Sequence, residues 1–155
     1  MSPTYPLTIY FDASCALCNS EMQNIKRHDA ENCLRLVDCS AENFDDSAFH
    51  LEGITREAMM NCLHAQAADG SWIKGVAAFE VIYRSVGMAS IAKLWVHPLV
   101  RPLAERAYPW IVKRRHLLSA LRLHKLFGLW SHSAAVQANM RSQACSAGQC
   151  KISAK

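Results

Sequence analysis

Two cysteines near the start of the chain, Cys15 and Cys18, follow directly after an apolar run and constrain the fold more than any other feature. The run Leu7–Phe11 is rich in β-branched and aromatic residues, which predicts a buried strand. After it, apolar side chains recur at the spacing of one helix face, at Cys18, Met22 and Ile25. The sequence therefore predicts a strand that passes into a helix, with both thiols at the junction.

This junction favours redox chemistry at the two thiols. A thiol at the first turn of a helix lies near unpaired backbone N–H groups and the positive end of the helix dipole. These favour a thiolate on Cys15 and lower its pKa from about 8.5 to a value within about 3.5–7.5. Cys15 is expected to be the more exposed thiol and to attack a substrate disulfide, and Cys18 to resolve the mixed disulfide. Asp12 either accepts a proton from Cys18 or caps the turn.

The composition is that of one globular domain with an appendage. A chain of 155 residues can form a hydrophobic core without stabilising disulfides or metal ions. Its 51% hydrophobic and 19% charged residues exclude a disordered or fibrous protein. The net charge of +4 is modest, so no nucleic-acid partner is expected. No secretory signal and no apolar stretch of about 18 residues is evident. The missing secretory signal favours a cytoplasmic location, and in such a reducing compartment seven cysteines, an odd number, favour catalytic or metal-binding thiols over structural disulfides.

The chain after the dithiol alternates between strand-like and helix-like segments. In order, they are a strand at 34–38, a helix from 56 to about 61 with Thr55 as its N-cap, a hairpin of 62–67 and 72–74, and a helix from 76 to about 87. We therefore expect an α/β fold with the β-α-β-α-β-β-α order of the thioredoxin fold. The first crossover makes its two strands parallel and puts the dithiol at a rim of the sheet.

The remaining chain is expected to be an addition to this core. The predicted division is a thioredoxin-like domain at 1–87, a helical extension packed on it at 88–140, and a polar tail at 141–155. Pro98, Pro102 and Pro109 are expected to break or restart the helices of the extension. The segment Leu117–Trp130 has a wide apolar face beside a narrow basic stripe. Packing on the sheet domain or on another subunit is the simpler interpretation, and a membrane-surface helix is the alternative.

With these segments in place, the chain resembles the DCC family of thiol-disulfide oxidoreductases, a branch of the thioredoxin-like superfamily. The family's aromatic-Asp-Gly-x-Cys-x-x-Cys pattern maps onto Phe11-Asp12-Ala13-Ser14-Cys15-Ala16-Leu17-Cys18. Its Asp-Gly turn, Gly-x-x-Ala helix start and Tyr-to-basic segment map onto Asp69-Gly70, Gly75-Val76-Ala77-Ala78 and Tyr108–Arg115. The resemblance runs roughly from Leu7 to His116. It implies disulfide exchange at the Asp and two Cys for which the family is named, here Asp12, Cys15 and Cys18.

Two features depart from the expected pattern. Ala13 replaces the family's usual Gly, so a positive φ at this position would cost roughly 1 kcal/mol or must be absent. Thioredoxins also place a cis-proline opposite the dithiol, just before the third strand, but the region Gly53–Leu63 contains no proline. Substrate docking on such a proline is therefore not expected.

A competing hypothesis makes the chain a zinc-binding or partner-docking module. Cys15 and Cys18 could combine with a second pair, Cys145 and Cys150, in a tetrahedral Cys₄ site. The second pair could instead act as an accessory dithiol or be inert.

The other chemistry-bearing residues support no further site. Cys33, Cys39 and Cys62 fall in or beside predicted strands and are expected to be small core residues. The seven histidines are dispersed, and no nucleotide-binding glycine motif is present, so no cofactor or catalytic metal is expected. The favoured function is a thiol-disulfide oxidoreductase that acts on protein or small-molecule disulfides, with an unidentified thiol as its electron donor.

Overall fold

A four-stranded mixed sheet in the order β2-β1-β3-β4 lies at the centre of the molecule. The structure is a computed structural model that describes residues 3–120, with side chains as far as Arg115. The strands are β1 (Leu7–Phe11), β2 (Leu34–Asp38), β3 (His64–Gln66) and β4 (Trp72–Lys74). Strand β1 pairs in parallel with β2 and antiparallel with β3, and β3 and β4 form an antiparallel hairpin.

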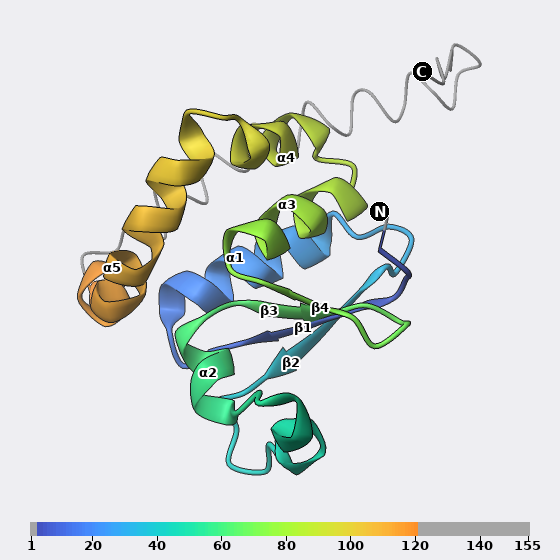
Figure 1. Cartoon of the computed structure of the whole chain (residues 1–155), viewed down its shortest axis with the longest axis vertical. Helices are drawn as coiled ribbons and strands as arrows, with labels where there is room; N and C mark the ends of the chain where they lie inside the picture. Colours follow the sequence, from blue (N-terminus) through green and yellow to red (C-terminus); the bar gives the residue numbers. More distant parts are fainter. Residues whose placement is uncertain (1–2, 121–155) are drawn as a thin grey trace.

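Helices cover both faces of this sheet. They are α1 (Ala16–Arg27), α2 (Arg56–Asn61), α3 (Val76–Ser85), α4 (Ala89–Val96) and α5 (Val100–Ala120), with a 3-10 helix η1 (Ser47–Glu52). Figure 1 shows α1 and α3 on one face, with α4 and α5 beyond them, and α2 on the other side. The element order confirms the predicted thioredoxin-like α/β core with a helical extension.

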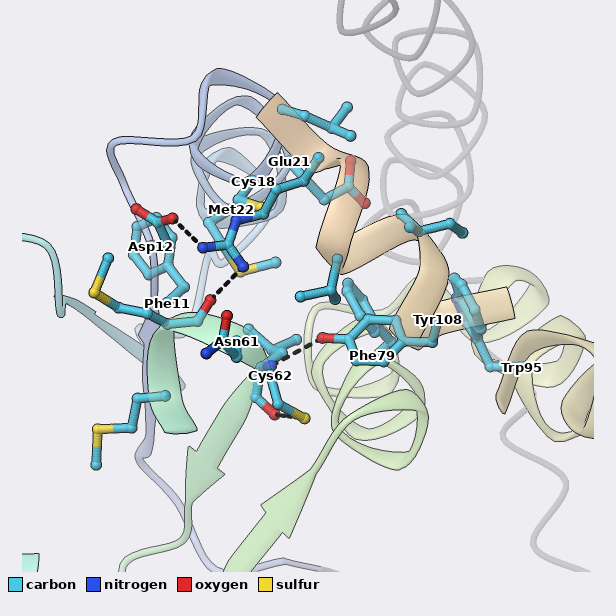
Figure 2. Close-up of a pocket in the computed structure, with 17 residues that line it drawn as sticks. Phe11, Asp12, Cys18, Glu21, Met22, Asn61, Cys62, Phe79, Trp95 and Tyr108 are labelled. Atoms are coloured by element: carbon cyan, nitrogen blue, oxygen red, sulfur yellow. Dashed lines mark hydrogen bonds and ion pairs between the residues drawn. The ribbon is translucent and has the colours of Figure 1, made fainter. Parts of the chain in front are cut away.

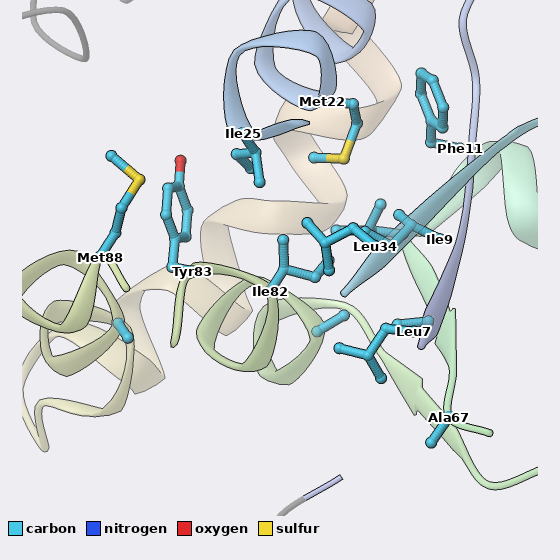
Figure 3. Packing of buried hydrophobic residues seen from close by; sticks show 14 residues of the cluster. Leu7, Ile9, Phe11, Met22, Ile25, Leu34, Ala67, Ile82, Tyr83 and Met88 are labelled. Atoms are coloured by element: carbon cyan, nitrogen blue, oxygen red, sulfur yellow. The ribbon is translucent and has the colours of Figure 1, made fainter. Parts of the chain in front are cut away.

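The alternation of side chains along β1 explains why helices pack on both faces. Leu7, Ile9 and Phe11 point to the face covered by α1 and α3 and belong to the larger buried cluster (Figure 3). Tyr10 points to the opposite face and belongs to a second cluster with Cys39, Ile54 and Met59. The central strand is therefore buried on both sides, and its carboxyl end is held in a fixed position.

Most predicted boundaries agree with the structure, including the Thr55 cap, which accepts a hydrogen bond from the backbone of Ala58. The predicted break at Pro109 is wrong, because this residue lies inside the continuous helix α5. A proline removes one backbone hydrogen bond of a helix, and tertiary contacts can compensate for that loss. Here Tyr108 and Arg115 attach α5 to the core on either side of the proline.

Helix α5 contacts the sheet domain through polar bonds at the end of the sheet that carries the dithiol. The hydroxyl of Tyr108 accepts a hydrogen bond from the backbone N–H of Leu63 at 2.9 Å. The guanidinium of Arg115 donates to the backbone carbonyl of Met60 at 2.7 Å and forms an ion pair with Asp12 at 2.8 Å. The last described helix thus lies against the loop that follows the first strand. The predicted domain boundary at residue 87 stays a prediction.

Some sequence predictions concern residues outside the range 3–120 that the structure describes. The side chains of the amphipathic segment Leu117–Trp130 lie outside it, as do Cys145 and Cys150. Within residues 3–120, no helix combines the length and the apolar character that a membrane crossing requires.

The Tyr108 contact predicts a measurable contribution to stability. Tyr108→Phe leaves the buried N–H of Leu63 without its acceptor, which should lower the free energy of unfolding by about 1–2 kcal/mol. Denaturant unfolding measures this change. Tyr5→Phe, at a residue that is 45% exposed, is the matched control and should change stability by less than about 0.5 kcal/mol. Equal stability of both variants would contradict this role of Tyr108.

Candidate active site

The dithiol lies at the strand-to-helix junction that the sequence predicts. Cys15 is the N-cap residue of α1, and its sulfur accepts a hydrogen bond from the backbone N–H of Cys18 at 3.5 Å. Both thiols are free rather than joined as a disulfide. A sulfur at an N-cap receives the backbone N–H groups that the first helical turn cannot use itself.

Side chains at the end of β2 hold the loop before the dithiol. Asp38 accepts a hydrogen bond from the backbone N–H of Ala13 at 3.1 Å, and the hydroxyl of Ser40 accepts one from the backbone N–H of Ser14 at 3.1 Å. Asn32 is the non-glycine residue with positive φ within residues 3–120, so Ala13 carries no such strain. The replacement of the family's Gly therefore has no conformational cost at this position.

Asp12 is buried between this loop and α5. One carboxylate oxygen accepts hydrogen bonds from the backbone N–H and the hydroxyl of Ser14, at 3.0 and 2.5 Å. The other lies 2.8 Å from a guanidinium nitrogen of Arg115, an ion-pair distance without the alignment of a hydrogen bond. The turn-forming role of Asp12 is thus present in the structure. Proton transfer to Asp12 stays a prediction.

The surroundings of Cys15 stabilise its thiolate. The hydrogen bond that the Cys18 thiol donates to Cys15 is the largest cause, and with the backbone N–H groups of Cys18 and Leu17 it lowers the pKa of Cys15 to about 6. Burial and the charge of Asp12 oppose this shift. Most of Cys15 is therefore thiolate at neutral pH, as its position at the helix start predicts.

The Cys18 thiol holds its proton more firmly. Its pKa is raised above the ordinary value, first by the hydrogen bond it donates to Cys15 and then by burial and the negative charge on Cys15. The nearby Arg115 opposes the shift. The two thiols therefore share one proton, which resides on Cys18.

The exposure of the two thiols is the reverse of the expectation. Cys15 has no exposed surface, whereas Cys18 is partly exposed and lines a cavity. Cys15 lies at the N-cap of α1, directly after the loop that Asp12 and Asp38 hold, and Cys18 lies one turn further along the helix. Cys15 thus carries the stabilised thiolate, whereas Cys18 is the thiol that solvent can reach.

The cavity beside Cys18 has a volume of about 240 Å³ and lies between α1 and α5 (Figure 2). Its wall is mostly apolar and includes Met22, Met59, Phe79, Ile111 and Val112.

The cavity also contains residues that sequence reasoning did not place there. Cys62 was expected in the core but lines this cavity, whereas Cys39 is fully buried as expected. Glu21 also lines it, and burial raises the pKa of its carboxyl to about 7. Tyr108 and Arg115 belong to the segment that the family resemblance had marked, but no sequence signal pointed to Glu21 or Cys62.

The described part of the chain offers no metal-binding cluster. Within residues 3–120, no group of three or more His, Cys, Asp or Glu side chains could hold a metal ion. The zinc hypothesis also needs Cys145 and Cys150, which lie outside the described residues.

Comparison with known proteins gives one distant curated relative and no solved structure. An uncharacterized chloroplastic protein of Arabidopsis thaliana is 26% identical over 112 residues, which cover 72% of this chain. The chain spans about half (51%) of the length of that relative. No solved structure matches the chain. The location of this chain in the cell stays a prediction.

A protein-family model covers nearly all of the described structure. Residues 9–121 match the model of the DCC1-like thiol-disulfide oxidoreductases, and this range includes the dithiol, Asp12 and Arg115 of α5, which forms an ion pair with Asp12. The position of the dithiol at the start of α1 agrees with the chemistry that this family description states. The chain therefore belongs to the DCC1-like thiol-disulfide oxidoreductase family.

Proposed function

We propose that this protein exchanges electrons with disulfide-containing substrates through Cys15 and Cys18. The observation that carries the proposal is the shared proton of the two thiols: Cys18 donates a hydrogen bond to Cys15, whose pKa is lowered to about 6. Thiol-disulfide exchange requires a thiolate, and a low-pKa thiolate is also a good leaving group. An unidentified thiol would return the electrons after each turnover.

The proposed reaction has two steps. The Cys15 thiolate attacks one sulfur of the substrate disulfide, forms a mixed disulfide and releases the first substrate thiolate. Cys18 then loses its proton and attacks the Cys15 sulfur, which closes the Cys15–Cys18 disulfide and releases the second thiolate. The proton of Cys18 passes to a released thiolate. The substrate gains two electrons and the enzyme loses two.

For Cys15 to attack first, a substrate must be able to reach its sulfur. Cys15 carries the thiolate but has no exposed surface, so the structure around Cys15 must open before a substrate sulfur reaches it. In the opposite direction, a substrate thiolate attacks the Cys15 sulfur of the oxidised enzyme and expels the Cys18 thiolate. Both directions therefore pass through the same mixed disulfide on Cys15.

The zinc-binding alternative receives no specific support. No metal cluster is present within residues 3–120, and the proposed ligands Cys145 and Cys150 are outside that range. The redox proposal depends on the first pair of cysteines alone.

Single cysteine variants test the proposal. During disulfide reduction, Cys18→Ser should accumulate a mixed disulfide on Cys15, because the resolving thiol is absent. Cys15→Ser should accumulate none. Thiol trapping followed by mass mapping identifies the modified residue. A mixed disulfide on Cys18 in Cys15→Ser would reverse the order, and unchanged disulfide reductase activity in both variants would overturn the function.

The titration of Cys15 gives a second prediction. Because the folded pKa lies below the ordinary value, the thiolate absorbance in the ultraviolet should rise with pH around a midpoint of about 6. Cys18→Ala removes the thiol donor and should move the midpoint upward. Cys39→Ser is the control, since burial raises the pKa of Cys39 to about 12. An unchanged absorbance between acidic and neutral pH would contradict the stabilised thiolate.

Asp12 can be tested separately for proton transfer. Asp12→Asn should lower the free energy of unfolding by about 3 kcal/mol, because it leaves Arg115 buried without its ion partner. If Asp12 also accepts the Cys18 proton, resolution of the mixed disulfide should slow about 100-fold. Arg115→Gln breaks the same ion pair but keeps the carboxylate. Equal slowing in both variants would show that Asp12 acts only through the ion pair.

A further inference from the structure

Three residues that line the cavity beside Cys18 have a buried polar atom without a hydrogen-bond partner: an oxygen of Asp12, which lies beside the Arg115 guanidinium, and one N–H group each of Arg115 and Trp95. The Nε of Arg115 and the Nε1 of Trp95 are buried, and neither has a hydrogen-bond acceptor within the described residues. Both residues line the cavity, and the Arg115 residue is only 8% exposed. Buried donors in proteins nearly always have an acceptor, so these two indicate an oxygen-bearing occupant.

The remaining wall of the cavity favours an apolar occupant. Met22, Phe79, Ile111 and Val112 contribute side chains from α1, α3 and α5. The charge of Arg115 is already balanced by Asp12 at 2.8 Å. A second carboxylate in this cavity would therefore lose its hydration without gaining a free cation.

The size and place of the cavity limit the occupant further. About 240 Å³ is less than the roughly 300–1,000 Å³ of pockets for drug-sized ligands, so one or two side chains fit better than a large cofactor. Figure 2 shows Trp95 and Asp12 on opposite sides of the cavity, with Cys18 on the side of Asp12. The unpartnered N–H groups of Arg115 and Trp95 therefore lie on opposite sides of the apolar wall. A peptide has carbonyl groups on both sides of each side chain, so an apolar side chain in the cavity would place one carbonyl near each N–H group.

We propose that this cavity binds an apolar side chain next to the disulfide of a peptide substrate, with peptide carbonyl oxygens accepting hydrogen bonds from Arg115 Nε and Trp95 Nε1. The proposal rests on the proposed function and names its substrate class. A side chain in the cavity would hold the adjoining disulfide beside the dithiol, where the exchange reaction takes place. Glutathione disulfide, which has only charged and polar groups around its sulfurs, would not fill this cavity.

Matched peptides test this specificity. Two disulfide-linked peptides that differ only by Phe or Ser beside each cysteine are compared with glutathione disulfide, with dithiothreitol as the electron donor. The wild-type protein should reduce the Phe peptide with a kcat/KM at least about 10-fold above that of the Ser peptide, mainly through KM. Equal kcat/KM for both peptides would overturn the inference and leave the proposed function intact.

Variants of α5 connect the preference to the cavity. Ile111→Gln places a polar group in the wall at a residue that is 39% exposed, and it should reduce the preference at least about 5-fold. Leu103→Gln, on the same helix but 69% exposed and outside the cavity, is the control and should keep the preference. A folded Ile111→Gln protein that keeps the full preference would overturn the inference.

Two further outcomes are decisive. Trp95→Phe keeps an apolar wall but removes the N–H. It should therefore raise the KM for the Phe peptide more than the KM for dibenzyl disulfide, which has no carbonyl groups. If wild type prefers dibenzyl disulfide to the Phe peptide, the peptide carbonyls have no role and the proposal is overturned. If the wild type reduces none of the disulfides, the proposed function itself fails.

Discussion

The buried ion pair between Asp12 and Arg115 joins the first strand of the sheet to the last described helix. Arg115 also donates to the backbone of Met60, so one guanidinium contacts the loop after β1 and the end of α2. A buried pair of this kind contributes little net stability but leaves a costly unpaired charge if one partner is lost. Its main effect is positional: it places α5 beside α1 and so creates the cavity next to Cys18.

The chemistry of the dithiol depends on this arrangement as much as on the helix start. Any thiol at an N-cap receives backbone N–H groups, which explains part of the low pKa of Cys15. The largest cause, however, is the hydrogen bond from Cys18, and Arg115 and Asp12 act on Cys18 in opposite directions. The site therefore combines the backbone N–H groups at the start of α1 with charges from distant segments. It places the stabilised thiolate on the buried Cys15 and the protonated thiol on Cys18, which lines the cavity.

The sequence predicted those features that depend on neighbours in the chain. The strand and helix around the dithiol, the Thr55 cap and the Asp-Gly turn follow from local spacing and turn chemistry. The contact of Arg115 with Asp12 and the positions of Glu21 and Cys62 at the cavity depend on packing between distant segments, which no local pattern encodes. Pro109 shows the same limit, because tertiary anchors keep a helix continuous where its local chemistry predicts a break.

A redox titration of the full chain, with thiol trapping and mass mapping at each potential, tests the central claim most directly. The account predicts that Cys15 and Cys18 form a disulfide with each other in a single reversible two-electron step. Cys39, which is fully buried, should stay reduced throughout the titration. Failure of Cys15 and Cys18 to pair at any potential, or pairing of either one only with a different cysteine, would contradict the assignment of this dithiol as the redox centre.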